Sequence, residues 1–244
     1  MTGTPGAPGA HSTTALHLAD EGEAADLAAF LGRLIHYDRA AAVRLQVSGT
    51  ALAVFGRPPS FEVLAIRTAR LAKPYENGLD VTLDVTVSAG ELLESIDEPA
   101  ATLAVPQSVT GPPWAGVLPP RGGWQQVPGL PELDAVRAML SMAVAEFRSR
   151  TEELAPEDRT RGELDRIGRE IWSREIGGTG LPVRAAHAAQ ALGFLRPAGP
   201  GRQVAPGESP LALYSSGAWL RLRAPYGSIA VRRAGFGALG VSVR

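Results

Sequence analysis

The sequence predicts an α+β protein, in which an antiparallel β-sheet unit with flanking helices precedes a helical unit finished by a C-terminal β-hairpin. Three observations favour this class. Apolar and polar residues alternate between residues 43 and 87, as in half-buried strands. Apolar residues recur at helical spacing between residues 133 and 176. Alternation returns after residue 210. The length of 244 residues allows one large domain or two small ones.

The chain begins with a segment that we expect to be a disordered tail, residues 1–15. It is mostly Gly, Pro, Thr and Ala, which bury too little apolar surface to offset the entropy of ordering. The first helix is predicted to begin near Asp20, a plausible N-cap with Glu23 three residues later. Its apolar face consists of Leu27, Phe30, Leu31, Leu34 and Ile35.

Four strand-like segments follow the first helix, at residues 43–47, 51–55, 61–71 and 80–87. The Asn77-Gly78 turn is a strong hairpin signal and predicts that the last two segments pair. Ser88 and Glu91 form a capping box for a short helix, and residues 101–105 form a fifth strand. We therefore expect residues 16–105 to form an antiparallel meander with its helices on one face.

Residues 106–131 hold seven of the twenty prolines and two of the four tryptophans, Trp114 and Trp124. So many prolines prevent a regular helix or a central strand, because each fixes φ and removes a backbone donor. The tryptophans, with Val117 and Leu118, supply apolar surface that a plain flexible linker lacks. We expect an ordered, extended strap docked on the protein's own sheet or helices.

The second unit, residues 132–244, is predicted to begin with three helices. They cover residues 133–147, residues 157–176 and a segment that starts at Pro182. Gly177-Gly178-Thr179-Gly180 ends the second helix. A hairpin then pairs residues 211–214 with 219–223, and a further turn leads to residues 229–233. No internal repeat is evident beyond these hairpins.

Composition excludes several kinds of site. The chain has no cysteine, so it holds no disulfide, zinc–thiolate site, iron–sulfur cluster or cysteine nucleophile. Its first residues lack the features of a signal peptide, and no run approaches the roughly 18 apolar residues of a membrane span, so we expect a cytoplasmic protein. Lys73 is the single lysine among 24 basic residues, which suggests codon bias.

The net charge of −1 hides an asymmetry. Residues 15–104 carry a net charge of −6, whereas residues 195–244 carry +6. Within the hairpin, Arg221 and Arg223 alternate with Leu220 and Leu222, so both arginines should lie on one strand face and both leucines on the other. We expect the arginines to contact the acidic first unit of the same or a partner chain, and nucleic acid only as a second choice.

No motif in the sequence predicts a catalytic, cofactor-binding or metal-binding residue. Gly235 to Gly240 matches G-x-G-x-x-G but lacks the strand–helix context of a dinucleotide site. The loop at Gly177 follows a helix and lacks a P-loop lysine, which favours a helix–helix corner. The histidines show no metal-ligand spacing apart from the unconvincing pair of His36 and Asp38, and His187 lies among alanines on a helix.

The leading functional hypothesis is a non-catalytic regulator, adaptor or structural component that acts through protein–protein contacts or self-association. The first alternative is a winged-helix-like nucleic-acid binder, whose recognition helix would offer Arg184, His187 and Gln190. The second is an enzyme without a recognisable motif. The candidate partner contacts are Arg221, Arg223, Arg232, Trp114 and Trp124.

Overall fold

The computed structural model describes residues 14–72, 83–197 and 209–233 and confirms the α+β class. The helices are α1 (Glu21–Tyr37), α2 (Ala89–Glu94), α3 (Leu133–Glu152), α4 (Arg161–Trp172) and α5 (Val183–Ala191). The strands are β1 (Ala15–His17), β2 (Ala42–Ser48), β3 (Ala51–Gly56), β4 (Leu64–Arg70), β5 (Asp84–Ser88), β6 (Ile96–Asp97), β7 (Thr102–Ala104), β8 (Gln125–Val127), β9 (Ala212–Ser216), β10 (Trp219–Ala224) and β11 (Gly227–Arg232). All strand pairs are antiparallel.

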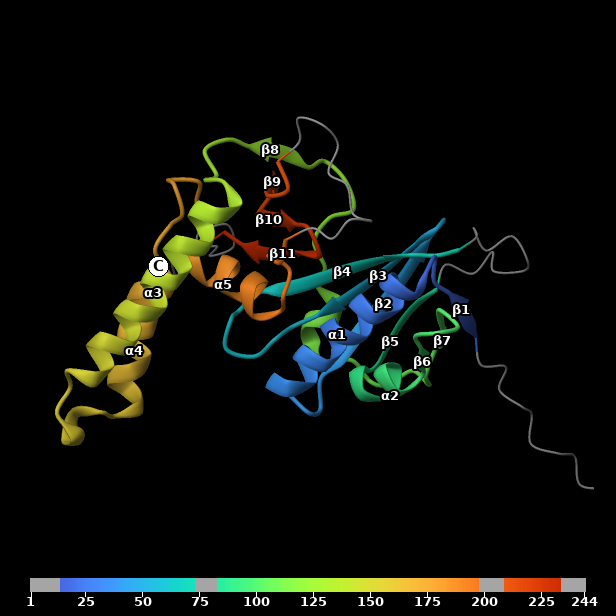
Figure 1. The fold of residues 1–244 in the computed structure, drawn as a ribbon, viewed down its shortest axis with the longest axis horizontal. Coiled ribbons are helices and arrows are strands. Elements are labelled where there is room, and N and C mark those ends of the chain that lie inside the picture. The colour runs from blue at the N-terminus through green and yellow to red at the C-terminus, as the bar shows by residue number, and fades with distance from the viewer. Residues whose placement is uncertain (1–13, 73–82, 198–208, 234–244) are drawn as a thin grey trace, which may run out of the picture.

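One sheet runs through both halves of the chain, in the order β5-β2-β3-β4-β11-β10-β9-β8 (Figure 1). The C-terminal hairpin continues the N-terminal sheet, because β11 pairs with β4 through Ile229 opposite Ala65. The prediction that the fourth strand segment pairs with the third was wrong. β5 pairs with β2 instead, since the free edge of β4 is taken by β11. The Asn77-Gly78 turn lies outside the described residues.

The main core lies between the sheet and the helices α1 and α5. On β10, Leu220 and Leu222 are fully buried in this core, as their alternation with arginines predicted. Phe30 of α1 and Phe194, just after α5, have ring centroids 5.5 Å apart, so the two helical regions share a single apolar layer. Apolar residues on one face of the strands therefore bring both halves of the chain into one core.

The same order of elements occurs twice around the centre of the sheet. A helix and three strands, α1-β2-β3-β4, are matched by α5-β9-β10-β11, and the last strands of the two sets pair with each other. This repeat was not evident from the sequence, because α5 is much shorter than α1 and the two sets differ in side chains. A strand also lies outside each set, β5 beside β2 and β8 beside β9.

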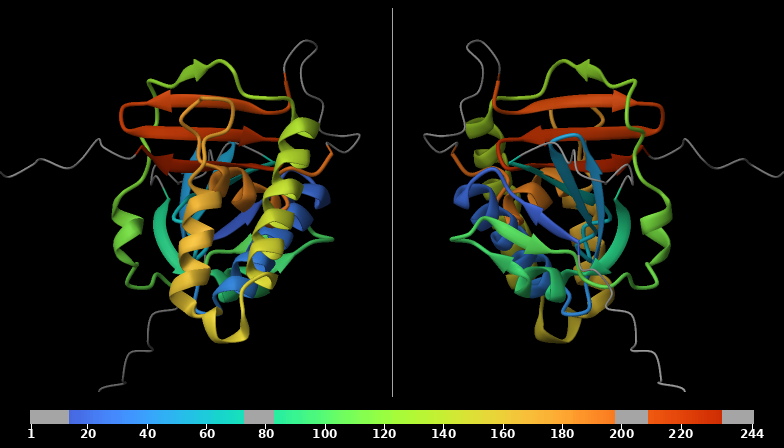
Figure 2. Two further views of the ribbon diagram at one scale, coloured as in Figure 1. Left: turned by 90° about the vertical axis from the view of Figure 1, so that its left-hand side faces the viewer. Right: turned by 90° about the vertical axis from the view of Figure 1, so that its right-hand side faces the viewer.

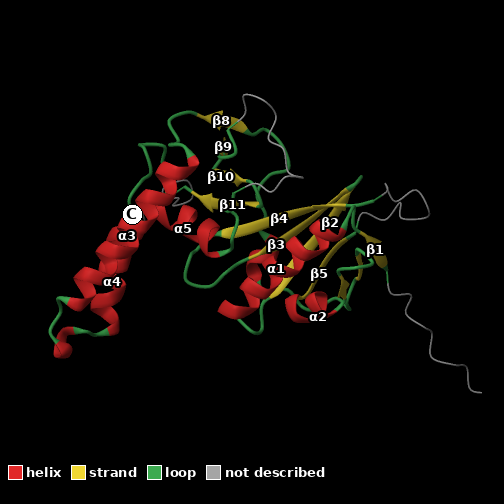
Figure 3. Cartoon of the chain, viewed as in Figure 1, coloured by secondary structure: helices red, strands yellow, loops and turns green. Residues whose placement is uncertain are grey.

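Two helices project beyond this layered body. In Figures 1 and 3, α3 and α4 run side by side away from the sheet. The base of α3 is fixed in the core by Val136 and Leu140. Further out, an ion pair joins the two helices, because Arg150 contacts Glu170 at 2.8 Å. Arg174, two residues beyond the end of α4, contacts Glu146 of α3 at 2.5 Å. The helix predicted over residues 157–176 is shorter, because Thr160 caps α4 and the chain leaves it after Trp172.

A second sheet of three short strands, β1-β7-β6, contacts α1 through β6 and is joined to the end of β4 by a bridge between Leu18 and Leu71. Ala15, assigned to the expected tail, begins β1, whose Leu16 is fully buried. Residues 1–13 of that tail lie outside the described residues. The predicted caps are confirmed: Asp20 accepts a hydrogen bond from the amide of Glu23 at 2.8 Å, and Ser88 starts α2.

Candidate functional site

The strap crosses the face of the sheet that lies opposite α1 and α5 (Figure 2). It begins at the β5 edge, where Ser108 forms a bridge to that strand. Midway, Arg44 on β2 donates a hydrogen bond to the carbonyl of Ala115. At the far edge, the hydroxyl of Ser216 donates to the carbonyl of Gly122 at 3.1 Å, and β8 then adds the eighth strand. The strap therefore contacts both halves of the sheet.

Two strap side chains dock on the sheet, as the sequence predicted. Trp114 and Leu118 pack against a second apolar cluster, separate from the main core. Val117 was expected to dock with them, but 49% of its surface is exposed. Trp124 is half-buried, and its indole nitrogen donates to the carbonyl of Pro120 at 3.0 Å. The cluster beneath the strap consists of Phe55, Leu64, Ile66 and Ala230.

Beyond this cluster, the same side of the sheet pairs arginines with aromatic rings. The guanidinium carbon of Arg221 lies 5.9 Å from the ring centroid of Trp124. The corresponding distances are 5.8 Å between Arg223 and Tyr214 and 5.6 Å between Arg232 and Trp219. Such pairs are held by attraction between the cation and the ring quadrupole. We call this surface the basic aromatic face; it consists of Arg221, Arg223, Arg232, Tyr214, Trp219 and Trp124.

Within the basic aromatic face, the surroundings of Arg221 are unfavourable for its positive charge. Burial lowers the pKa of Arg221, and the neighbouring charge of Arg223 lowers it further. Within the described part of the chain, Arg221 forms no ion pair with a carboxylate. The other end of the sheet differs, because there Arg44 holds Asp84 at 2.7 Å and lowers the pKa of that carboxyl through a hydrogen bond.

A shallow cavity of about 290 Å³ lies where the strap meets this face. Arg221 and Arg121 supply its cationic side, and Phe55, Ile66 and Pro119 supply apolar surface. The cavity thus joins the docked part of the strap to the basic aromatic face. A ligand there would meet two guanidinium groups and an apolar floor.

The five candidate contacts chosen from sequence all lie on this side of the sheet. Arg221, Arg223 and Arg232 follow from strand alternation, and the strap brings in Trp114 and Trp124. Sequence reasoning missed Trp219 and Tyr214. Trp219 alternates in step with Arg221, so the sequence could have placed it on the same face. Tyr214 lies opposite Arg221 only because of the β9–β10 register, which the sequence does not show.

The arrangement is not that of a winged helix. That alternative required α5 to present Arg184, His187 and Gln190 to DNA. Instead Arg184 contacts Glu62 at 3.8 Å and the His187 ring stacks on Trp172. The hairpin is also no free wing, because β11 is hydrogen-bonded to β4.

The hairpin arginines were expected to pair with the acidic first unit. Within the described residues, neither Arg221 nor Arg232 forms an ion pair with that unit. Another arginine connects the halves, since Arg196 contacts Asp26 on α1 at 2.9 Å. An acidic group that pairs with Arg221 or Arg232 must therefore come from outside the described part of this chain.

Of the two glycine-rich motifs, the one at Gly177 has a structural role and the other lies outside the described residues. Gly177 adopts φ +59°, and a Cβ atom there would lie 2.6 Å from the carbonyl oxygen of Gly129, so the glycine loop closes against the end of the strap. Within the described ranges, no group of three His, Asp or Glu residues could hold a metal ion. The match at Gly235 to Gly240 falls outside these ranges.

The comparison with protein families finds two matches, and neither family has a known function. Two family models match, each described as a domain of unknown function: DUF8010 over residues 11–116 and DUF8185 over residues 119–236. The two matches meet inside the strap. No curated protein matches the sequence. Among the described helices, none has the length and apolar character needed to cross a bilayer.

Two solved structures show a distant likeness in fold. The beta sliding clamp of C. crescentus has a TM-score of 0.44 and 12% identity over 90% of this chain and 65% of the clamp. The DNA polymerase sliding clamp from Pseudomonas aeruginosa has a TM-score of 0.44 and 11% identity over 90% of this chain. This chain spans 64% of that second clamp. At this level the likeness does not transfer the function of either clamp.

Proposed function

We propose that this protein is a non-catalytic binding protein that recognises an acidic segment of a protein partner through its basic aromatic face. The observation that carries the proposal is Arg221, a half-buried cation that lies beside Arg223 and over Trp124 without a described carboxylate. The free protein pays for keeping like charges together in a partly desolvated place. A partner's carboxylates would remove that cost, so part of the binding free energy is already stored in the face.

The composition of the face supports a protein partner. Arginine, tryptophan and tyrosine are the residues that most often dominate binding energy at protein interfaces. The three arginines are held against rings, which reduces the side-chain entropy lost when a partner binds. The main-chain scaffold is also rigid, because β10 is paired on both sides.

Single-stranded nucleic acid is the second candidate ligand, because bases stack on aromatic side chains and phosphates bind arginine. The rings of Trp124, Trp219 and Tyr214 give this alternative its basis. However, a guanidinium already covers each ring, and the pI of about 6.4 is far below the value above 9 typical of nucleic-acid-binding domains. We therefore favour the acidic protein segment.

The test measures binding of a fluorescent Glu/Asp-rich peptide and of a single-stranded oligonucleotide of equal charge, at low and moderate salt. We expect the peptide to bind and the double variant Arg221→Ser with Arg223→Ser to bind at least about ten-fold more weakly, since charged hydrogen bonds are lost. The matched control is Arg148→Ser with Arg161→Ser, which removes two exposed arginines elsewhere.

A second variant guards against a folding defect. Arg221→Lys keeps the charge but loses the planar group that stacks on Trp124, so it should fold normally and bind the peptide with intermediate affinity. Tighter binding of the oligonucleotide than of the peptide, with a steep salt dependence, would favour the nucleic-acid alternative. Binding of neither probe would refute the assignment of this face.

A further inference from the structure

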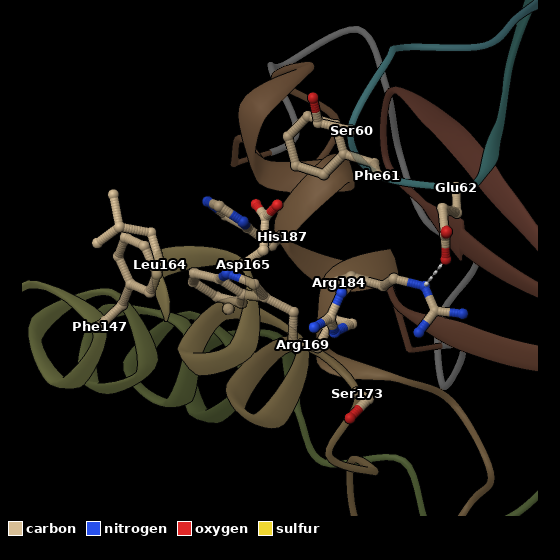
Figure 4. Close-up of a pocket in the computed structure, with 12 residues that line it drawn as sticks. Ser60, Phe61, Glu62, Phe147, Leu164, Asp165, Arg169, Ser173, Arg184 and His187 are labelled. Atoms are coloured by element: carbon tan, nitrogen blue, oxygen red, sulfur yellow. Dashed lines mark ion pairs between the residues drawn. The ribbon is translucent and has the colours of Figure 1, made fainter. Parts of the chain in front are cut away.

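A second, larger cavity lies between α4, α5 and the loop that joins β3 to β4 (Figure 4). Its volume is about 700 Å³, which falls within the range of small-molecule sites. The projecting end of α3 closes one side through Phe147. Four separate segments of the chain therefore converge on one hollow.

One wall of this groove is a series of aromatic contacts. The His187 ring stacks on Trp172 with a centroid distance of 4.4 Å and an interplanar angle of 13°. The Phe61 ring contacts His187 in an edge-to-face arrangement, with a centroid distance of 5.4 Å. The ring centroid of Phe147 lies 6.0 Å from that of Trp172. Trp172, His187 and Phe61 are all half-buried, so part of each ring still borders the groove. Such a wall suits a flat apolar group.

The opposite side supplies cations. Arg184 and Arg169 both line the groove. The Nε atom of Arg184 is buried and donates no hydrogen bond, and the ion pair of this residue with Glu62 is long, at 3.8 Å. A buried donor without an acceptor is costly, and guanidinium groups prefer the paired oxygens of a carboxylate. Glu62 is a poor partner here, because 74% of its side chain is exposed.

The loop that carries Phe61 holds an unusual backbone. Ser60 has φ 72° and Glu62 has φ 53°, values that non-glycine residues rarely adopt. Strain of this kind persists where surrounding structure fixes it, and it is common at ligand sites. In this loop it sets Phe61 against His187 and turns Glu62 toward Arg184 (Figure 4).

From this geometry we propose that the groove binds a carboxylate that carries a flat aromatic ring. The ring would lie on the wall made by Trp172 and His187, and the carboxylate would displace Glu62 and bind Arg184, with Arg169 beside it. Two sources share this chemistry: a free aromatic acid and the C-terminal aromatic residue of a peptide. The site is separate from the basic aromatic face and does not depend on the function proposed for that face.

Two acidic residues of the groove limit the ligand. Asp165 lines the cavity and is held only loosely by Arg161 at 3.9 Å. Glu62 competes directly with the ligand for Arg184. A ligand with a single carboxylate therefore fits better than one with two. Removal of the Glu62 charge should strengthen binding, which is an unusual result for a change at the rim of a pocket.

The experiment compares 3-phenylpropionate with its amide, and N-acetyl-Gly-Phe with its C-terminal amide. Binding to the full chain is followed by calorimetry and by the NMR shifts of the His187 ring and the Trp172 indole. We expect the acids to bind and shift these signals, and the amides to bind at least about ten-fold more weakly. Tighter binding of the free acid or of the peptide identifies the source.

Three variants decide whether Arg184 is the anchor. Arg184→Gln should weaken binding of the acids about ten-fold or more, and Glu62→Gln should tighten it. Arg166→Gln is the matched control, since this arginine lies on α4 but pairs with Glu163 and does not line the groove. Equal binding of acid and amide, no binding of either acid, or weaker binding by Glu62→Gln would each overturn the proposal.

Discussion

Arg67 shows how one residue can join two elements. It stands on the helix side of β4, where its neighbours Ala65 and Ala69 are apolar, and only 2% of its surface is exposed. Its guanidinium contacts Glu23 of α1 at 2.8 Å and donates to the carbonyl of Tyr226 at 3.1 Å. A buried pair of this kind stabilises the fold only while both partners are present.

Glu23→Gln should therefore lower the free energy of unfolding by about 2–3 kcal/mol, because the buried Arg67 loses its nearer carboxylate and keeps Asp26 at 3.4 Å. Arg70, which also contacts Glu23 at 3.0 Å, loses a partner as well. Chemical denaturation gives the measurement. Glu21→Gln, an exposed change two residues earlier on α1, should stay within about 0.5 kcal/mol of the parent protein. Similar values for both variants would mean that the buried pair is not stabilising.

The half-buried side chain of His187 should make the stability of the fold depend on pH. Burial lowers its pKa from the usual value, so the unfolded chain takes up a proton at a higher pH than the folded one. The contribution is complete above the unfolded pKa of about 6.5 and is lost as pH falls through the folded pKa. The unfolding free energy should thus fall as the pH drops below about 7. His187→Gln should reduce the dependence of the unfolding free energy on pH, and an unchanged dependence in that variant would contradict the role of His187. His17→Gln, at an exposed site, should leave the dependence as it is in the parent protein.

At the scale of elements, the strap is the segment whose behaviour the sequence predicted most directly. Its prolines are incompatible with a helix or a central strand, and the apolar side chains of Trp114 and Leu118 are buried when the strap docks on the sheet. Its final residues nevertheless form β8 at the sheet edge, a position that tolerates the flanking Pro128. The strap is thus both a cover for the second apolar cluster and a link to the outer strand.

Trp114→Ala should lower the free energy of unfolding by about 2 kcal/mol, less than the roughly 3–5 kcal/mol of a fully buried tryptophan, because this one is half-buried. Thermal and urea unfolding provide the measurement. Val117→Ala, three residues along the strap and 49% exposed, should change stability by no more than about 0.5 kcal/mol. An unchanged melting temperature in Trp114→Ala would show that docking of the strap adds nothing to the fold.

Local elements were predictable because their signals lie in adjacent residues. The caps at Asp20 and Ser88 and the alternation around Leu220 and Leu222 were all confirmed. Strand partners were not predictable, since the pairing of β4 with β11 depends on residues far apart in the chain. The groove was missed for the same reason, as its wall combines Phe61 with Trp172 and His187 from separate helices.

For the whole molecule, the central question is whether the halves are independent. We propose that residues 16–105, the strap 106–131 and residues 132–244 act as one folding unit, because one sheet and one core include parts of all three. The two family matches meet between residues 116 and 119, yet the sheet continues across that boundary.

Fragments 11–116 and 119–236 should therefore be poorly folded when produced separately, since each exposes an unpaired strand edge and half of the core. Produced together, they should form a one-to-one complex with a cooperative thermal transition. Size-exclusion chromatography and circular dichroism distinguish these states. A cooperative transition in either fragment alone would establish independent domains.

The central pairing also has a consequence during synthesis. β4 leaves the ribosome about 160 residues before β11, which at about 5–20 residues per second is a wait of roughly 8–30 s. Throughout that time its outer edge has no strand to receive it. Arg70 places an exposed charge near the end of this edge, a feature that discourages pairing between nascent chains. The rate of translation, more than the final stability, should therefore set how much of the protein escapes aggregation.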